Sequence, residues 1–175
     1  METRCRSPVT ARFASEILAG HDRRAFASGN DRIDGHFRQA VSQDVRRRYA
    51  TCYLLIEQET KAIAGFYTLA ASGVDLAAVP EALTARLPRY PTVPAALIGW
   101  LGRDLSFRGQ RIGSMLLGDA LHRVASSPIA AHAIVADAID DDAAEFYRRH
   151  HFISVPSGRF YLPVSTAHRL AGGLA

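Results

Sequence analysis

The feature that most constrains this chain is a buried-strand pattern that leads into a glycine-containing basic turn and then into a helix. The strand pattern covers 95–104, the turn covers 108–113, and a helical pattern follows over 112–125. The first backbone N–H groups of a helix have no acceptor inside the helix, and the helix dipole is positive at that end. The segment therefore predicts a binding site for a phosphate-like anion.

The residue types in the turn agree with this prediction. Gly109 and Gly113 permit a ligand to approach the backbone closely, and Arg108 and Arg111 offer forked donors to phosphate oxygens. The chain has no Gly-Lys-Ser/Thr triplet of a nucleotide-triphosphate loop and no G-x-G-x-x-G dinucleotide fingerprint. Without further information, an ordinary strand, turn and helix with two solvated arginines explains the same pattern.

A second strand and helix pair is predicted over 132–138 and 141–150. Three aspartates at 140–142 are suited to capping this helix, and Tyr147 follows Phe146 in its second turn. Taken alone, Tyr147 is either a functional hydroxyl or a core tyrosine.

The remaining patterns describe an α/β protein. Apolar residues recur every four positions from Ile33 to Tyr49, which predicts a helix over 33–49. The connection 80–94 contains four prolines and is a typical place to hold an acceptor substrate. The other expected elements are a helical stretch over Phe13–Leu18, a hairpin of strands 51–57 and 63–71, a short helix over 81–87, strands over 152–155 and 160–164, and a frayed tail from Ser165.

Composition sets broad limits. The 175 residues predict one domain over 1–175, with 1–30 as a lead-in and 165–175 as a tail. No apolar run has the length of a membrane span and the N-terminus lacks a signal pattern, so we expect a cytoplasmic protein without a membrane partner. Two cysteines and scattered histidines predict no metal site, and Cys52 is interpreted as a core residue. A net charge of +4 favours anionic partners.

Two segments resemble the GNAT superfamily of N-acetyltransferases. The turn is similar to its motif A, Arg/Gln-x-x-Gly-x-Gly/Ala, from Arg108 to Gly113, with Arg111 at the middle glycine. The second helix is similar to the pattern Ala-x-x-Phe-Tyr-x-x-x-Gly-Phe from Ala143 to Phe152, with His151 at the glycine. The resemblance implies a mixed, mostly antiparallel sheet of six to seven strands flanked by about four helices.

The resemblance also implies a site for acetyl-coenzyme A. The end of the strand near Leu101 would supply a backbone N–H to the thioester carbonyl and would pair with the pantetheine amides. The residues implied to hold the coenzyme are Leu101, Gly102, Arg103, Arg108, Gly109, Gln110, Arg111, Ile112, Gly113 and Ser114.

Tyr147 is the implied catalytic residue, a general acid that protonates the departing thiolate. No general base is evident, because Asp104 and Asp137 are interpreted as turn or capping carboxylates. A base is unnecessary if the acceptor is the weakly basic α-amine of an aminoacyl ester.

The chain from about residue 26 to 164 further resembles a GNAT subgroup, the toxins of type II toxin–antitoxin modules. The similar segments are 64–73, Ala-Gly-Phe-Tyr-Thr-Leu-Ala-Ala-Ser-Gly, and 98–104, where Trp100 and Gly102 replace the usual arginine and alanine. The subgroup acetylates aminoacyl-tRNA and so blocks translation. Its arginine candidates for tRNA here are Arg46, Arg47, Arg86, Arg89 and Arg148, with Arg38, Arg48 and Arg149 as further ones; each is otherwise a solvated surface charge.

The same resemblance implies several partners. They are a neutralising antitoxin, often a ribbon-helix-helix DNA binder with a disordered tail, and a second copy of the chain in a homodimer. DNA is implied only through the antitoxin. Two alternatives stay open: a housekeeping GNAT that acetylates a small-molecule or protein amine, and a GNAT fold that binds acyl-coenzyme A without turnover.

Overall fold

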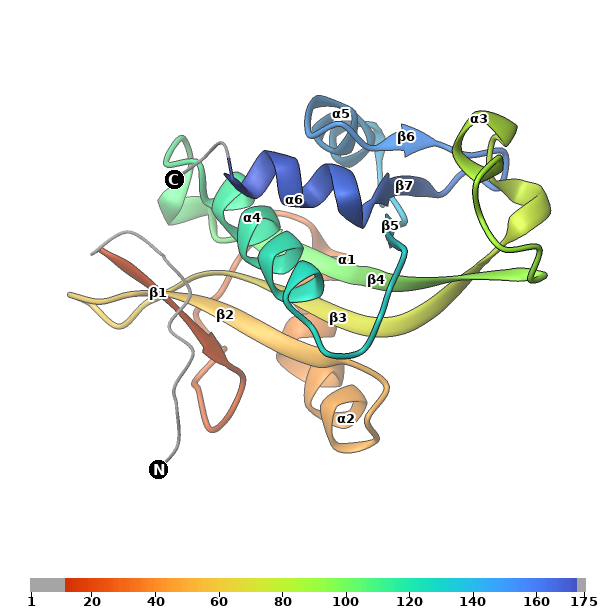
Figure 1. Cartoon of the computed structure of the whole chain (residues 1–175). Helices are drawn as coiled ribbons and strands as arrows, with labels where there is room; N and C mark the ends of the chain where they lie inside the picture. Colours follow the sequence, from red (N-terminus) through yellow and green to blue (C-terminus); the bar gives the residue numbers. More distant parts are fainter. Residues whose placement is uncertain (1–11, 173–175) are drawn as a thin grey trace. The chain divides into compact units, whose positions relative to one another are not determined.

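The computed structural model describes residues 12–172, so Cys5 and the outermost parts of the predicted lead-in and tail lie outside the described residues. Seven strands form a sheet in the order β1-β2-β3-β4-β5-β7-β6 (Figure 1). β4 pairs with β5 in parallel, and β1–β2, β2–β3, β5–β7 and β6–β7 are antiparallel. The predicted α/β class and the mostly antiparallel sheet are confirmed.

The chain divides into two compact units. Unit 1 contains residues up to Leu69 together with Trp100–Ala120, and unit 2 contains Ala70–Gly99 and the residues from Leu121 onward. The strands β3 (Ile63–Asp75) and β4 (Thr92–Arg103) and the helix α4 (Ile112–Ala125) contribute residues to both.

In unit 1 the predicted hairpin is present as β2 (Thr51–Glu57) and β3, and its two faces bury different partners. Side chains alternate between faces along a strand. One face joins Phe37 and Val41 in an apolar cluster that also contains Cys52, Leu54, Ile56 and Phe66. The other face meets the first half of α4, where Tyr67 donates a 2.6 Å hydrogen bond to Asp119.

The helix predicted over 33–49 is interrupted. It consists of α1 (Asp31–Gly35), a π-helical turn (His36–Ala40) and α2 (Val41–Arg46). A spacing of four residues is wider than the 3.6 residues of an α-helical turn, and the wide π turn makes up the difference. Phe37 and Val41 are consequently buried, whereas Tyr49 lies beyond the helix and is 76% exposed, so the predicted end of this helix was wrong.

Unit 2 contains the short helix α3 (Glu81–Thr84), the strands β5 (Ala133–Ala136), β6 (Ile153–Ser154) and β7 (Phe160–Pro163), and the helix α5 (Asp141–Arg149). α5 packs through Tyr147 on the face of β7 that carries Phe160. Tyr161 belongs to a different apolar cluster, together with Val74, Val79, Val93, Ala95, Ala133, Val135 and Val155.

Two predicted segments were wrong. Phe13–Leu18 was expected to be helical, but Phe13–Ile17 forms strand β1, paired with β2 from Phe13↔Glu57 to Ile17↔Tyr53. Backbone pairing with a neighbouring strand overrides a weak local helical pattern. The expected frayed tail is a helix, α6 (Val164–Gly172), on which Ala167 is fully buried. Burial of one face stabilises this short helix.

Candidate active site

Strand β4 extends beyond its pairing with β5. The register between them ends at Ile98↔Ala136, while β4 continues to Arg103. In the described chain, the stretch 99–103 therefore presents backbone N–H and C=O groups that β5 does not use. A strand edge of this kind pairs readily with another extended, amide-containing group.

The turn after β4 is held in place from both sides. The backbone N–H of Asp104 donates to Ala64 O, and that of Leu105 donates to Ala27 O, each at 2.9 Å. The Asp104 carboxylate accepts from the N–H groups of Ala27 and Ser106. Asp104 is thus a turn carboxylate, as predicted, and it fixes the direction in which the chain enters α4.

Helix α4 begins where the anion site was predicted. It spans Ile112–Ala125, the same bounds as the sequence pattern, and its first turn contains no acidic residue. The N–H of Met115 donates to Arg111 O, so the N–H groups of Ile112 and Gly113 precede the first intrahelical bond. Ile112, Leu116, Leu117 and Ala120 are at most 1% exposed and anchor the helix, whereas Arg108, Gly109, Arg111 and Ser114 are exposed at its N-terminus.

Both residues that replace family glycines have a left-handed backbone. Arg111 has φ +57° and His151 has φ +67°. This conformation costs an L-residue with a side chain roughly 1–2 kcal/mol, which is why glycine is common at such positions. The departures from the family patterns therefore keep the backbone geometry that glycine would favour and add a side chain to it.

Two polar atoms in the predicted coenzyme segment have no partner. Arg103 Nη1 and Gln110 Oε1 are buried and make no hydrogen bond within residues 12–172. A buried polar atom without a partner is unfavourable by about 1–3 kcal/mol, so a ligand that supplies the missing bonds is stabilised. A guanidinium donor and an amide acceptor match a phosphate oxygen and an amide N–H respectively, so the residues fit a coenzyme with both groups.

Close packing explains the glycine at position 102. A Cβ on Gly102 would lie 2.7 Å from Ile33 Cγ2 and 2.9 Å from Phe66 Cε1. A Cβ on Gly65 would meet Leu116 Cδ1 at 2.7 Å and Gly102 O at 2.8 Å. Ile33 and the rings of Phe66 and Phe26 fill the space that the usual alanine at position 102 would need. Gly65 lets β3 approach α4 and the backbone of β4.

Tyr147 lies in unit 2, on the buried face of α5. Only 5% of its surface is exposed, and its ring contacts Phe146, Phe152 and Phe160. Burial, aided by the negative charge of Asp137, raises the pKa of the Tyr147 hydroxyl well above that of a free tyrosine. The hydroxyl therefore holds its proton throughout the physiological pH range, as a general acid must.

The carboxylates near Tyr147 have structural partners. Asp140 caps α5 by accepting from Ala143 N at 2.8 Å. Asp137 forms a two-pronged ion pair with Arg159, whose Nε and Nη2 lie 2.8 and 2.9 Å from its two oxygens. Arg159 Nη1 also lies 3.5 Å from Ser72 Oγ on β3. Sequence reasoning missed Arg159, whose partners are distant in the chain.

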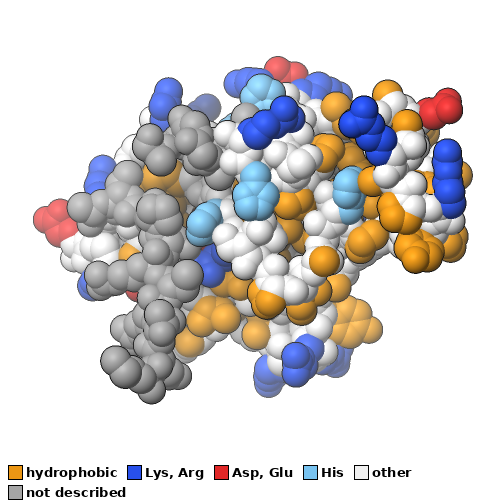
Figure 2. Space-filling model, in the orientation of Figure 1, with side chains coloured by type: hydrophobic (Ala, Val, Ile, Leu, Met, Phe, Trp, Pro, Cys, Tyr) orange, Lys and Arg blue, Asp and Glu red, His pale blue; other side chains and the backbone are white. Residues whose placement is uncertain are grey.

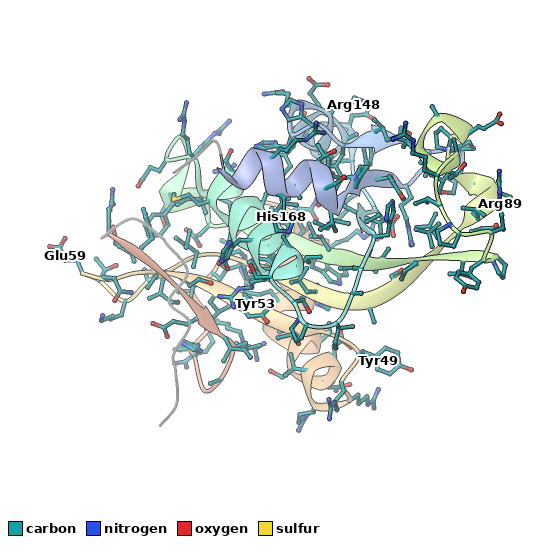
Figure 3. The ribbon with its side chains drawn as sticks, viewed as in Figure 1. Tyr49, Tyr53, Glu59, Arg89, Arg148 and His168 are labelled. Carbon is teal, nitrogen blue, oxygen red and sulfur yellow. The ribbon has the colours of Figure 1, made fainter. Side chains whose placement is uncertain are left out.

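The arginines predicted for tRNA occupy several places. In unit 1, Arg46, Arg47 and Arg48 are exposed around the end of α2, where Figure 2 shows Lys and Arg side chains gathered. In unit 2, Arg86 and Arg89 follow α3, and Arg148 and Arg149 are on α5; Figure 3 shows Arg89 and Arg148 on these different segments. Arg38 donates to Phe26 O at 3.0 Å and is therefore structural in part.

Other side chains have structural roles. Cys52 is fully buried, and desolvation raises the pKa of its thiol to about 12, as suits a core residue. Among residues 12–172, no three His, Cys, Asp or Glu side chains gather in a way that holds a metal ion. None of the helices in this part of the chain is both long and apolar enough to cross a bilayer.

Comparisons with known proteins reveal related toxins. No family model matches the chain. The probable toxin TacT of Sinorhizobium fredii is 28% identical over 163 residues, which cover 87% of this chain and 90% of that protein. The tRNA-acetylating toxin of Mycobacterium tuberculosis is 29% identical over 148 residues, covering 83% of this chain and 87% of that protein.

Solved structures share the fold. A mutant of KacT superposes with a TM-score of 0.83 at 22% identity, covering 91% of this chain and 99% of that one. AtaT complexed with acetyl-methionyl-tRNAfMet gives 0.82 at 24% identity, with coverage of 90% and 98%. AtaT bound to acetyl-CoA and to the C-terminus of the antitoxin AtaR gives 0.76 at 21% identity, with coverage of 90% and 97%.

These likenesses extend over nearly the whole described chain. They agree with the motif A and second-helix patterns at Arg108–Gly113 and Ala143–Phe152, which the structure places at the N-terminus of α4 and along α5. The chain is therefore similar to toxins that include a tRNA-acetylating one, and it shares the fold of KacT and AtaT.

Proposed function

We propose that this protein is an acetyl-coenzyme A-dependent N-acetyltransferase toxin that acetylates the α-amine of aminoacyl-tRNA. The proposal rests on one observation above all: the backbone of β4 continues past β5, and the basic turn that follows it ends at the N-terminus of α4, whose first turn has no acidic residue. An extended edge followed by an anion site matches a ligand with an amide-containing arm and a diphosphate. The homology to a tRNA-acetylating toxin and the AtaT complexes with acetyl-CoA and acetylated tRNA support the same reaction.

In this proposal unit 1 holds the coenzyme. The backbone of Leu101, Gly102 and Arg103 pairs with the pantetheine amides, and a Leu101 N–H polarises the thioester carbonyl. The diphosphate is held at the α4 N-terminus, where main-chain donors and the dipole of a 14-residue helix favour negative charge. The residues that take part there are Arg108, Gly109, Gln110, Arg111, Ile112, Gly113 and Ser114.

The proposed proton donor for the leaving group is Tyr147. When bound, acetyl-coenzyme A supplies an acetyl group activated as a thioester. As the amine nitrogen bonds to the acetyl carbon and the carbon–sulfur bond breaks, Tyr147 Oη donates its proton to the sulfur. The tyrosinate then recovers a proton released from the amine nitrogen through solvent. The phenylalanine rings around Tyr147 restrict its orientation and exclude water.

No carboxylate acts as a dedicated base in this scheme. Asp104, Asp137 and Asp140 are engaged in a turn, an ion pair and a helix cap respectively. An acceptor that is already partly unprotonated at neutral pH is therefore favoured. The α-amine of an aminoacyl ester meets this requirement, whereas the side chain of lysine, with a pKa of about 10.4, does not.

The tRNA would contact the exposed arginines of both units. Affinity for nucleic acid comes largely from neutralising phosphates and falls steeply as salt rises. Arg46, Arg47, Arg86 and Arg89 have no ion-pair partner within residues 12–172. Arg148 has a 3.7 Å contact with exposed Glu145, and its guanidinium lies 5.6 Å from the centre of the Phe160 ring. These side chains are available to phosphate at little cost.

We further infer the setting of the enzyme. A neutralising antitoxin is supported by the solved complexes of AtaT with AtaR, and a ribbon-helix-helix antitoxin would link the pair to DNA. We also expect a homodimer, a single acetyltransferase domain over the whole chain, and a cytoplasmic location, because charged tRNA is used there.

The test is to incubate purified protein with acetyl-CoA labelled in the acetyl group and a pool of aminoacyl-tRNA. We expect label on the α-amine of one or a few aminoacyl esters, and growth arrest when the gene is induced. Label confined to protein lysines or to small polyamines, with normal growth, would contradict the toxin function and leave a housekeeping acetyltransferase. Absence of any acetyl transfer by folded protein that binds acetyl-CoA would instead indicate a non-catalytic binder.

A further inference from the structure

Unit 2 contains a cavity of 730 Å³ that the proposed reaction has not used. It is formed by the end of β3 and by the proline-containing connection between β3 and β4, with one residue from the turn before β7. This volume lies within the range of small-ligand sites in proteins. The polar side chains that line it are Asp75, Glu81, Thr84, Arg89 and Tyr90.

The lining combines an exposed aromatic ring with an arginine next to it. Tyr90 is 71% exposed although it is a large hydrophobic residue, and Arg89 precedes it. Arg89 forms no hydrogen bond or ion pair within the described part of the chain. In Figure 2, basic side chains share the surface over α3 with hydrophobic ones, a class that there includes proline and tyrosine. A ring next to a cation is a common arrangement for binding single-stranded nucleic acid.

The cavity is built from stiff segments. Pro80, Pro91 and Pro156 line it, and each restricts its own backbone. The N–H of Leu76 donates to Pro91 O at 2.9 Å, which closes the base of the connection. The Asp75 carboxylate accepts from Ala77 N at 3.0 Å and so is held at the rim. A preformed cavity loses little entropy when a ligand binds.

One lining residue of the cavity, Pro156, belongs to the turn that leads to Arg159. Pro156 lies in the turn in which Val155 N donates to Arg159 O at 2.9 Å. Arg159 in turn pairs with Asp137, whose charge acts on Tyr147, and contacts Ser72, three residues before Asp75 on β3. All of these residues belong to unit 2. Pro156 thus connects the cavity, through one turn, with the ion pair of Arg159 and Asp137.

We propose that this cavity binds one unpaired nucleotide of the RNA acceptor, with its base stacked on Tyr90 and its phosphate at Arg89. Asp75 and Glu81 accept hydrogen bonds from ribose hydroxyls or from an exocyclic amine of the base. The inference rests on the proposed function, since it names how the RNA of that reaction is held. It adds a specific nucleotide subsite to the diffuse attraction of the exposed arginines.

The charges in the cavity favour this occupant over an acidic peptide. The charged side chains that line the cavity are two carboxylates, Asp75 and Glu81, and one cation, Arg89, so a segment with several Asp or Glu side chains would be repelled. A nucleotide has a single phosphate charge and several donors, which matches one cation and two acceptors. A base inside a duplex has no free face, so the stacking position selects an unpaired nucleotide.

The experiment compares two RNA hairpins with the same stem, one blunt and one with four unpaired nucleotides at its 3′ end. We measure their affinity for the full-length protein at one fixed salt concentration. The variants are Tyr90→Leu, which removes the stacking ring, Tyr90→Phe, which keeps it, and Arg89→Ala. Arg169→Ala, on exposed α6 of the same unit, is the matched control for the loss of one positive charge.

We expect wild type, Tyr90→Phe and Arg169→Ala to prefer the overhang hairpin, and Tyr90→Leu to bind it about 10-fold more weakly. Affinity for the blunt hairpin should be unchanged by either Tyr90 substitution. Arg89→Ala should lower the affinity for the overhang hairpin more than Arg169→Ala does. Melting temperatures within a degree of wild type show that the variants are folded.

If Tyr90→Leu lowers the affinity for both hairpins equally, or lowers neither affinity, the proposed subsite is wrong. If aminoacyl-tRNA is still acetylated in that case, the proposed function stands and only the subsite fails. If the wild-type protein binds neither hairpin and acetylates no aminoacyl-tRNA, both fail together. The proposal is also overturned if an acidic peptide binds with an affinity that depends on Tyr90 and the overhang hairpin does not.

Discussion

Helix α4 and helix α5 both follow a strand of the sheet, but their N-termini are built differently. α4 has no acidic residue in its first turn and presents Arg108 and Arg111 to solvent. α5 is capped by Asp140, and Asp141 and Asp142 occupy its first turn. The positive end of α4 is therefore open to an anion, whereas that of α5 is neutralised by its own side chains.

This difference assigns separate roles to the two helices. In the proposed mechanism, α4 contributes its N-terminal end, through main-chain donors and nearby arginines. α5 contributes its body, where a buried tyrosine is held by three aromatic rings, and its closed N-terminus stabilises the helix that carries the tyrosine. Five substitutions test this division, with the largest effect expected for Tyr147→Phe and the smallest for the two changes to glycine.

Tyr147→Phe removes the proposed proton donor and keeps the aromatic ring. We expect the rate of acetyl transfer to fall by about 10²–10⁴-fold, because general acids contribute factors of this size. Acetyl-CoA affinity, measured by calorimetry, should stay within a factor of two. Because burial raises the pKa of Tyr147, the wild-type rate should not fall through ionisation of this group as the pH rises to about 10. A rate close to wild type for Tyr147→Phe would remove Tyr147 from the mechanism.

Ser114→Asp gives α4 the acidic first turn that α5 has. The added charge should repel the diphosphate and weaken acetyl-CoA binding by about 10-fold, equivalent to about 1.4 kcal/mol. The same charge should stabilise the free protein by about 0.3–1 kcal/mol, because it faces the positive end of the helix. Ser114→Asn is the neutral control. Unchanged affinity for acetyl-CoA would show that the coenzyme does not use this helix end.

Asp140→Ala opens the N-terminus of α5. Loss of the cap should lower the free energy of unfolding, measured by urea denaturation, by about 1 kcal/mol. Asp140→Asn should keep most of the wild-type stability, because asparagine caps equally well. Acetyl-CoA affinity should not change, since the proposed coenzyme residues belong to unit 1. Equal stability of the alanine and wild-type proteins would argue against a closed α5 N-terminus.

Arg111→Gly and His151→Gly restore the family glycine at the two left-handed positions. Glycine removes the cost of a left-handed backbone but adds conformational entropy to the unfolded chain. The net effect should stabilise each variant by about 0.5–1 kcal/mol. Only Arg111→Gly should also weaken acetyl-CoA binding, because only Arg111 lies at the proposed phosphate site. Equal coenzyme affinity in both variants would show that the Arg111 side chain does not contact phosphate.

Elements with strong local patterns were predicted well. The bounds of α4, the hairpin of β2 and β3 and the capping of α5 all follow from residues close together in the chain. β1 and α6 were missed because their backbone partners or buried face involve residues far away in the sequence. For the cavity at Tyr90, the sequence predicted only a proline-containing connection suited to holding a substrate. No periodic pattern indicates an exposed ring that follows an arginine.

The amino-acid sequence by itself determined the helix with a glycine-containing basic turn at its start, the tyrosine on the following helix and the resemblance to known acetyltransferases that these patterns carry. Helix periodicity, capping and turn chemistry act over a few residues, so they can be read along the chain. Only the tertiary structure decided that β4 extends beyond its pairing with β5, that Arg111 and His151 have positive φ angles, and that Arg159 pairs with Asp137. Strand register and burial depend on contacts between distant residues, and local patterns do not contain them.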